Sequence, residues 1–306
     1  MFSQISSGVW PTMITPFTSS GDVDYDGLGR LVEWYIQKKV AGLFAVCQSS
    51  EMFFLSLEER VRISRFVREK AGGRVPVIAS GHISGGFTDQ VHELNKMAET
   101  GIDALVLVTN RMALESESDE VWIRNAEKLV QQLPSGLNLG LYECPYPYKR
   151  LMSNEVLKWC ADTGRFQFVK DTSCDVETIR TRLDVVNDTK LKIFNANSAT
   201  LLETVKMGVA GYSGVMANFH PELYVWLLQN WKSSPQEAHE LSDYLSVGSL
   251  IEKQLYPVNA KYYLMLEGLL DNYVCRSKDH RAFGATHRME IEQFRRLSAK
   301  ISQRTS

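Results

Sequence analysis

Short apolar segments alternate with amphipathic segments along most of the chain. Eight of them are four to eight residues long, rich in β-branched or aromatic residues and bounded by Gly, Pro or polar residues, which is the pattern of buried strands. They are Val9–Thr15, Gly42–Cys47, Val75–Gly81, Ala104–Thr109, Leu137–Glu143, Phe166–Asp171, Leu191–Asn197 and Ala210–Met216. The amphipathic stretches between them, which we predict to be helices, include Leu28–Lys38, Leu57–Lys70, Val91–Thr100 and Asp119–Gln132.

The spacing of these segments predicts an α/β protein of the (β/α)8 TIM barrel type. Successive apolar segments begin 19 to 33 residues apart, and one strand followed by one helix needs about 30 residues. A doubly wound sheet is the alternative, but no Gly-x-Gly-x-x-Gly turn follows the first segment. After Pro221 only helical patterns occur, so we expect a barrel over residues 1–222 and a C-terminal helical extension over residues 223–306. The expected helices of the extension are Tyr224–Asn230, Pro235–Ser246, Ala260–Leu270 and His280–Ile301.

Helix starts support this assignment. The run from Ser56 to Glu59 is a capping-box pattern, in which the serine hydroxyl and the glutamate carboxylate each bind the other residue's backbone N–H. Asp24, Thr88 and Ser153 are the expected N-caps of three other helices.

Composition narrows the possible functions. The 306 residues are 44% hydrophobic and 23% charged, with a formal net charge of −2, which is typical of a soluble globular protein. No Lys/Arg cluster indicates nucleic-acid binding, and no apolar run has the length of a membrane span. The first ten residues lack the pattern of a secretory signal. The five cysteines form no Cys-x-x-Cys pair, so we expect free thiols in a cytoplasmic protein.

The carboxyl ends of the predicted strands are where a barrel places its functional residues. In the segment ending at Lys170, the side chains of Phe166, Phe168 and Lys170 share one face because strand residues alternate. If that face is the inside of the barrel, desolvation lowers the pKa of Lys170 and leaves more neutral amine to attack a carbonyl. The alternative is a lysine that points to solvent or pairs with Asp171.

Tyr142 ends the preceding predicted strand. Adjacent strands lie about 4.8 Å apart, so its hydroxyl would approach the Lys170 amine and relay protons during carbon–carbon cleavage. For Tyr142 alone, the alternative is a buried ring whose hydroxyl binds the backbone. The presence of both residues at neighbouring strand ends favours the catalytic interpretation.

Other patterns do not indicate a metal or a cofactor. The run Asp22–Gly27 followed by Glu33 matches the spacing of an EF-hand calcium loop. A strand is predicted before this run and a helix directly after it, so we interpret it as a turn with Asp24 as the helix N-cap. The six histidines have no metal-ligand spacing, and no phosphate loop is present. We therefore expect no metal site and no organic cofactor.

Six groups of residues, among them the segments around Tyr142 and Lys170, occur in the order of one enzyme family. They are Val9–Phe17, Ser49–Glu51 with Leu55–Arg60, Val75–Ala79, Leu141–Pro145, Val169–Asp175, and Gly208–Gly211 with Gly214–Asn218. Over essentially its whole length the chain resembles the dihydrodipicolinate synthase / N-acetylneuraminate lyase family of class I aldolases and lyases. The resemblance implies a (β/α)8 barrel with a C-terminal helical extension, commonly assembled as a tetramer.

The resemblance also implies roles for single residues. Lys170 would form a Schiff base with pyruvate or a related 2-oxo acid, and Tyr142 would act as the acid and base. Ser49 and Ser50 lie where the family binds the carboxylate of the 2-oxo acid with hydroxyl and backbone N–H groups. Gln48 takes the place of the hydroxyl residue that usually continues the proton relay from the tyrosine.

One difference from the family lies in the loop that binds the 2-oxo acid. The family sequence Gly-Thr-Thr-Gly-Glu or Gly-Ser-Thr-Gly-Glu reads Cys-Gln-Ser-Ser-Glu over Cys47–Glu51. Cys47 and Ser50 therefore replace two glycines. Because side chains disfavour a positive φ, we expect backbone strain at these two positions.

The pocket for the second substrate differs as well. Pro147 takes the place of the arginine that binds the second carboxylate in the synthases, and Ser198-Ala199 replaces the acidic pair that binds sugar hydroxyls in the sialic acid lyases. These differences argue against both reactions. Arg111 takes the place of an aromatic residue, and its guanidinium suits a carboxylate or a polyhydroxylated chain. We expect Arg111 to help bind a different polar substrate, with Thr172 and Ser213 as further candidate binding residues.

Together these observations predict a Schiff-base-forming class I lyase or aldolase. Its substrates would be pyruvate or a related 2-oxo acid and an aldehyde that the sequence does not identify. The reaction would be reversible aldol cleavage or addition, or dehydration of a 2-keto-3-deoxy acid. Two alternatives stay open: an authentic 4-hydroxy-tetrahydrodipicolinate synthase, and a catalytically silent barrel that binds a 2-oxo acid. We expect a homo-oligomer, either a tetramer or a dimer.

Overall fold

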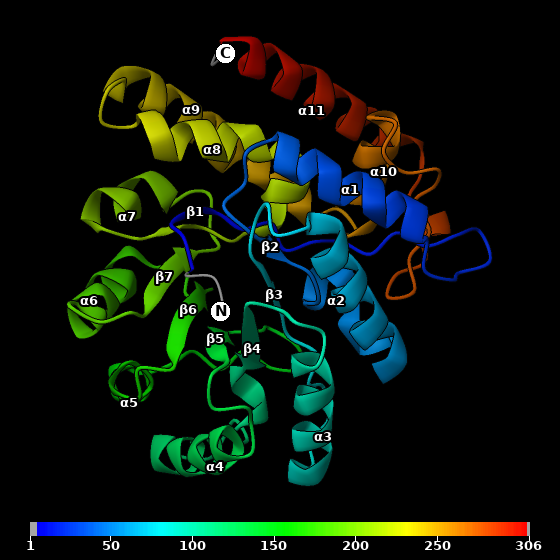
Figure 1. Cartoon of the computed structure of the whole chain (residues 1–306). Helices are drawn as coiled ribbons and strands as arrows, with labels where there is room; N and C mark the ends of the chain where they lie inside the picture. The colour runs from blue at the N-terminus through cyan, green and yellow to red at the C-terminus, as the bar shows by residue number, and fades with distance from the viewer. Residues whose placement is uncertain (1–4, 305–306) are drawn as a thin grey trace.

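Eight parallel strands form the centre of the computed structural model, which describes residues 5–304 (Figure 1). Within the sheet they are ordered β1-β8-β7-β6-β5-β4-β3-β2, and a parallel bridge between Thr12 and Phe44 joins the chain after β1 to β2. The ring is therefore closed, which confirms the predicted barrel and excludes the doubly wound sheet. The strands are β1 (Gly8–Val9), β2 (Leu43–Phe44), β3 (Val77–Ala79), β4 (Ala104–Val108), β5 (Asn138–Tyr142), β6 (Phe166–Asp171), β7 (Lys192–Asn195) and β8 (Gly211–Tyr212).

One helix follows each strand, and Figure 1 shows these helices around the outside of the barrel. They are α1 (Tyr25–Gln37), α2 (Leu57–Ala71), α3 (Phe87–Ala98), α4 (Asp119–Gln131), α5 (Asn154–Asp162), α6 (Val176–Val186), α7 (Leu201–Met207) and α8 (Pro221–Asn230). Each predicted strand overlaps an observed one, so the 19- to 33-residue rhythm is the repeat of the barrel.

The helical extension gathers on one side of the molecule, coloured from yellow to red in Figure 1. It contains α9 (Pro235–Gly248), α10 (Val258–Leu266), α11 (Ala285–Arg304) and the 3-10 helices η5 (Ser249–Lys253) and η6 (His280–Ala282). As predicted, the described residues after 221 contain no strand. The expected boundary after residue 222 falls within α8, which contacts β1 of the barrel.

Most of the predicted helix caps are present. Ser56 and Glu59 form the capping box of α2, and Asp24 and Ser153 accept backbone N–H bonds at the starts of α1 and α5. The N-cap prediction for Thr88 is wrong, because the N-cap is the extended Gly86, two residues earlier, and α3 begins at Phe87. The Asp24 cap also explains the calcium-like run of acidic residues as a turn into a helix.

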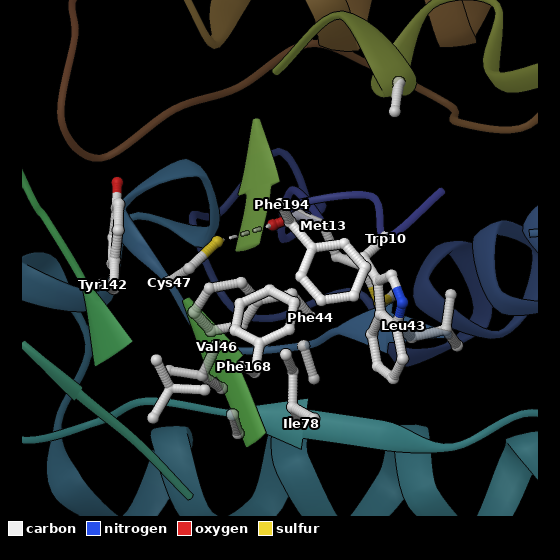
Figure 2. Close-up of a cluster of buried hydrophobic side chains, with 14 of the residues drawn as sticks. Trp10, Met13, Leu43, Phe44, Val46, Cys47, Ile78, Tyr142, Phe168 and Phe194 are labelled. Atoms are coloured by element: carbon white, nitrogen blue, oxygen red, sulfur yellow. Dashed lines mark hydrogen bonds between the residues drawn. The ribbon is translucent and has the colours of Figure 1, made fainter. Parts of the chain in front are cut away.

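Aromatic side chains fill the inside of the barrel. The ring of Phe168 stacks on that of Phe194 with centres 4.6 Å apart, and it meets Trp10 and Phe44 edge to face at 5.7 and 6.0 Å. Figure 2 shows Tyr142 at the edge of this cluster, with its hydroxyl pointing away from the packed rings. The interior is therefore a packed core rather than a pore, and it excludes water from the base of any site at the strand ends.

Candidate active site

A cavity of about 480 Å³ lies at the carboxyl ends of the strands. Its size is within the range of about 300–1,000 Å³ that is typical of small-molecule sites. The barrel contributes, among others, Gln48, Ser49, Tyr142, Lys170 and Thr172, and the extension contributes Glu252, Lys253, Tyr256, Pro257, Ser277 and Lys278. The structure thus brings together five of the predicted site residues and adds a wall that the extension supplies.

Lys170 and Tyr142 face each other from neighbouring strands. They are partners in the ladder between β6 and β5, and the Lys170 Nζ lies 4.7 Å from the centre of the Tyr142 ring. Each residue is only 3% exposed. Because burial disfavours the charged forms, it lowers the pKa of the Lys170 amine and raises the pKa of the Tyr142 phenol well above its usual range. The site therefore holds a readily deprotonated amine beside a phenol that keeps its proton at neutral pH.

Lys170 does not pair with Asp171. Successive residues of a strand point to opposite sides, and Asp171 directs its carboxylate to Arg182 of α6. Lys170 points the other way and lines the cavity. The structural alternative raised for this lysine is therefore excluded.

The 3-10 helix η1 (Gln48–Ser50) forms the side of the cavity beside the phenol. The Tyr142 hydroxyl donates to Gln48 Oε1 at 3.4 Å, and the Cys144 thiol contacts the same oxygen at 3.3 Å. Ser49 Oγ donates to Thr12 Oγ1 at 3.2 Å. A carboxamide oxygen accepts a hydrogen bond but has no hydroxyl proton to pass on. Gln48 therefore orients the Tyr142 phenol but does not continue a proton relay from it.

Three predicted binding residues engage their hydroxyls with the backbone. Ser50 Oγ accepts from the Cys47 N–H at 2.7 Å and donates to the Cys47 carbonyl at 2.6 Å. Ser213 Oγ donates to a carbonyl of the segment after β1 at 3.0 Å, and Thr172 Oγ1 donates to the Glu143 carbonyl at 2.8 Å. Thr172 still lines the cavity, whereas Ser50 and Ser213 are not among the lining residues.

Arg111 also lies outside the cavity lining. It ends η3 (Thr109–Arg111), and its guanidinium carbon lies 5.5 Å from the centre of the Phe53 ring. Phe53 and Tyr146 line the cavity and meet edge to face at 4.7 Å. Arg111 therefore contacts the aromatic wall, and it lines a separate surface depression beside Tyr148.

The prediction of backbone strain at Cys47 and Ser50 is wrong. Cys47 is extended, with a φ of −152°, and Ser50 has no positive φ; the left-handed residue is Glu51, with a φ of 62°. The Glu51 carboxylate accepts from Lys261 Nζ at 2.6 Å and from the Arg276 N–H at 2.8 Å. The left-handed turn therefore lies at Glu51, one residue after Ser50, and a buried ion pair with the extension holds it in place.

The contribution of the extension to the cavity was missed by sequence reasoning. Its Tyr256 hydroxyl accepts from Asn218 Nδ2 at 2.9 Å, and Tyr35 donates to the Oδ1 of the same asparagine at 2.5 Å. Through Asn218, the segment after η5 is therefore fastened to α1 and to the 3-10 helix Val215–Asn218 that follows β8. The segment is short and irregular, so no hydrophobic period marks its residues as parts of a site.

Behind the strand ends, Arg182 of α6 binds two buried carboxylates. Its Nη2 donates to Glu143 Oε1 at 2.7 Å and to the Met152 carbonyl at 2.7 Å, and its Nη1 binds Asp171. The side chains of all three charged residues are at most 1% exposed. Glu143 directly follows Tyr142, and Asp171 directly follows Lys170. The guanidinium therefore fixes the two strand ends that carry the facing amine and phenol.

The described part of the chain contains no group of three or more His, Cys, Asp or Glu side chains arranged to hold a metal ion. None of the helices over residues 5–304 is both long enough and apolar enough to cross a membrane.

A closed parallel barrel with a buried lysine beside a protonated phenol defines a Schiff-base-forming class I lyase or aldolase. The sequence model of the Dihydrodipicolinate synthetase family matches residues 5–278, so the chain belongs to that family.

Curated relatives agree with this assignment, and solved structures agree with the fold. The chain is 26% identical over 268 residues to a 4-hydroxy-tetrahydrodipicolinate synthase of Psychrobacter arcticus, and the match covers 86% of each protein. It is also 26% identical over 264 residues to the 4-hydroxy-tetrahydrodipicolinate synthase of Methanocaldococcus jannaschii, and this match covers 84% of the chain and 88% of the relative. A dihydrodipicolinate synthase of Bacillus anthracis has a TM-score of 0.87 at 20% identity, covering 96% of this chain and 99% of its own. A prophage protein of the same family from E. coli K12, solved in complex with pyruvate, has a TM-score of 0.85 at 22% identity, covering 97% and 98%. These structures share the barrel and its extension.

The buried charge cluster predicts a large loss of stability when its cation is removed. Arg182→Met leaves Glu143 and Asp171 buried without their partner, so the free energy of unfolding should fall by about 3–5 kcal/mol. Chemical denaturation monitored by circular dichroism measures this change. Arg180→Met on the same helix is the control, because Arg180 pairs only with the exposed Glu177 and should change stability little. Equal effects of the two substitutions would contradict a special role for the cluster.

Proposed function

We propose that this protein is a lyase or aldolase that binds pyruvate or a related 2-oxo acid as an imine on Lys170. The observation that carries the proposal is the position of the Lys170 amine, buried in the cavity 4.7 Å from the ring centre of Tyr142. A protein that only senses a 2-oxo acid needs no desolvated nucleophile, so the lysine favours an enzyme over the silent barrel.

The geometry suggests a separate chemical role for each of the two residues. The neutral Lys170 amine attacks the C2 carbonyl, and the Tyr142 phenol protonates the hydroxyl that leaves the carbinolamine as water. In the cleavage direction the 4-hydroxy group of the substrate then loses its proton and the C3–C4 bond breaks. The electron pair of that bond moves into the iminium to form an enamine. Protonation at C3 and hydrolysis of the imine return the 2-oxo acid and the free amine.

The carboxylate of the 2-oxo acid is the part that the loop after β2 would bind. Ser49 lines the cavity, and its hydroxyl, which donates to the Thr12 hydroxyl, can turn toward an anion. The E. coli relative solved with pyruvate supports this choice of substrate. Ser50 would act through the shape of the loop, because its own hydroxyl is occupied by Cys47.

A second candidate function is 4-hydroxy-tetrahydrodipicolinate synthesis, which the names of the curated relatives favour. The lack of a guanidinium among the described residues that line the cavity argues for another aldehyde. Pro147 offers no charge, and Arg111 lies outside the cavity lining, so no guanidinium lines the described cavity where a second carboxylate would bind. We further propose a cytoplasmic homo-oligomer, which the five free cysteines and the family support.

Trapping with borohydride tests the imine directly. Reduction in the presence of pyruvate should add a three-carbon unit to Lys170 and to no other lysine, as measured by mass spectrometry of peptides. Lys170→Met, which keeps a side chain of similar length, should give no adduct. Adduct on another lysine, or none on the parent protein, would refute the mechanism.

The lowered pKa of Lys170 predicts the pH dependence of imine formation. The neutral fraction of an amine rises with pH, so the exchange of pyruvate methyl protons for deuterium should speed up as pH rises through the pKa of Lys170. The midpoint should lie below the usual value of 10.5. Proton NMR measures this exchange after subtraction of the rate without protein. A midpoint at or above 10.5 would mean that the amine is not desolvated.

Removal of the Tyr142 hydroxyl should slow turnover and leave the fold intact. Tyr142→Phe keeps the ring that packs against Phe44 at 5.8 Å, and the loss of a general acid should lower kcat by about 10²–10⁴-fold. Steady-state assays of 2-keto-3-deoxy acid cleavage, with melting curves as the control for folding, measure this effect. Turnover within a few-fold of the parent would assign the proton transfer to another group.

A further inference from the structure

The wall that the extension contributes to the cavity carries charges that imine formation does not use. Glu252, Lys253 and Lys278 line this wall, and none of their three side chains makes a hydrogen bond or ion pair within the described residues. Glu51 also lines the cavity, but Lys261 and two backbone N–H groups occupy its carboxylate. Glu252 is therefore the cavity carboxylate that stays available to a ligand.

The position of Glu252 is fixed by bonds on both sides of it. Asn259 Nδ2 donates to the Ile251 carbonyl at 2.7 Å, and Tyr256 is fastened to Asn218 of the barrel at 2.9 Å. The carboxylate keeps access to solvent at the rim, yet the surrounding protein raises the pKa of Glu252, and the charge of Lys170 opposes this rise. Glu252 therefore shares one cavity with the nucleophile.

The chemistry of the reaction places the second substrate between these two groups. Its carbonyl carbon must lie beside C3 of the 2-oxo acid that Lys170 holds, so the rest of the aldehyde extends toward the rim. A carboxylate accepts hydrogen bonds only. It is costly to desolvate beside an alkyl chain and is stabilised by a hydroxyl donor. An ammonium group is disfavoured there, because the cations of Lys253 and Lys278 outnumber the free carboxylate.

We propose that Glu252 determines the second substrate by accepting a hydrogen bond from a hydroxyl group, so that the aldehyde is a hydroxylated one. This inference rests on the proposed imine chemistry and adds the substrate class to it. Lys253 and Lys278 tolerate an anionic group farther along the same chain.

The test compares two aldehydes of equal carbon number. Pyruvate is condensed with glyceraldehyde or with propanal, which lacks both hydroxyls, and kcat/KM is measured for the parent and for Glu252→Gln. The parent should prefer glyceraldehyde. The substitution keeps an acceptor oxygen but removes the charge. It should therefore lower kcat/KM for glyceraldehyde by about 5- to 10-fold, the difference between a hydrogen bond to a charged group and one to a neutral group, and change the value for propanal by less than about threefold.

Controls separate this inference from the function on which it rests. Glu237→Gln lies on α9 of the same extension, outside the cavity lining, and should change neither value. Borohydride trapping of pyruvate should be equal in the parent and in Glu252→Gln. If the parent fails to trap pyruvate, the proposed function falls. If it traps pyruvate but Glu252→Gln affects both aldehydes equally or neither, or if the parent condenses neither aldehyde, the role of Glu252 is refuted.

Discussion

The contact on which the site depends is the one between Arg182 and two buried carboxylates, Glu143 and Asp171. Successive strand residues point to opposite faces. When a contact on the outer face holds one residue in place, the backbone also holds the next residue, which points into the barrel. Glu143 follows Tyr142 and Asp171 follows Lys170. A single guanidinium on α6 therefore holds the two strand ends in one arrangement. This arrangement sets the distance between the amine and the phenol.

The opposite face of the same strands supplies the other requirement, an apolar floor. Phe168 precedes Lys170 by two residues and therefore points the same way, into stacked rings that exclude water. Because the amine stands above this floor, burial lowers its pKa. On the outer side of the strands Arg182 pairs with two carboxylates, whereas the floor beneath the Lys170 amine is apolar. That separation favours a neutral amine over a structural cation at Lys170, which is what the proposed imine chemistry requires.

The sequence was sufficient for the parts of the site that follow from a period of two. Lys170 and Tyr142 were found from alternation and strand order, and the capping box at Ser56 and Glu59 from local spacing. Contacts between distant segments were not predictable in the same way. The left-handed turn at Glu51 depends on Lys261, 210 residues away, and Glu252 enters the cavity from a segment without periodicity. Arg111 was placed at the correct strand end, but the Phe53 ring occupies the space beside it.

These differences divide the site into two mechanically distinct parts. Lys170 and Tyr142 are held by ladder hydrogen bonds and by a buried cluster, so a substitution near them disturbs the barrel itself. Glu252 lies on a short 3-10 helix whose position depends on a few side-chain bonds, such as that from Asn259 to the Ile251 carbonyl. A substitution in this segment changes the side chains at the rim of the cavity and leaves the hydrogen bonds between the strands intact. In the proposed mechanism, the formation of the imine and the choice of aldehyde can therefore vary independently, because they depend on different elements of the fold.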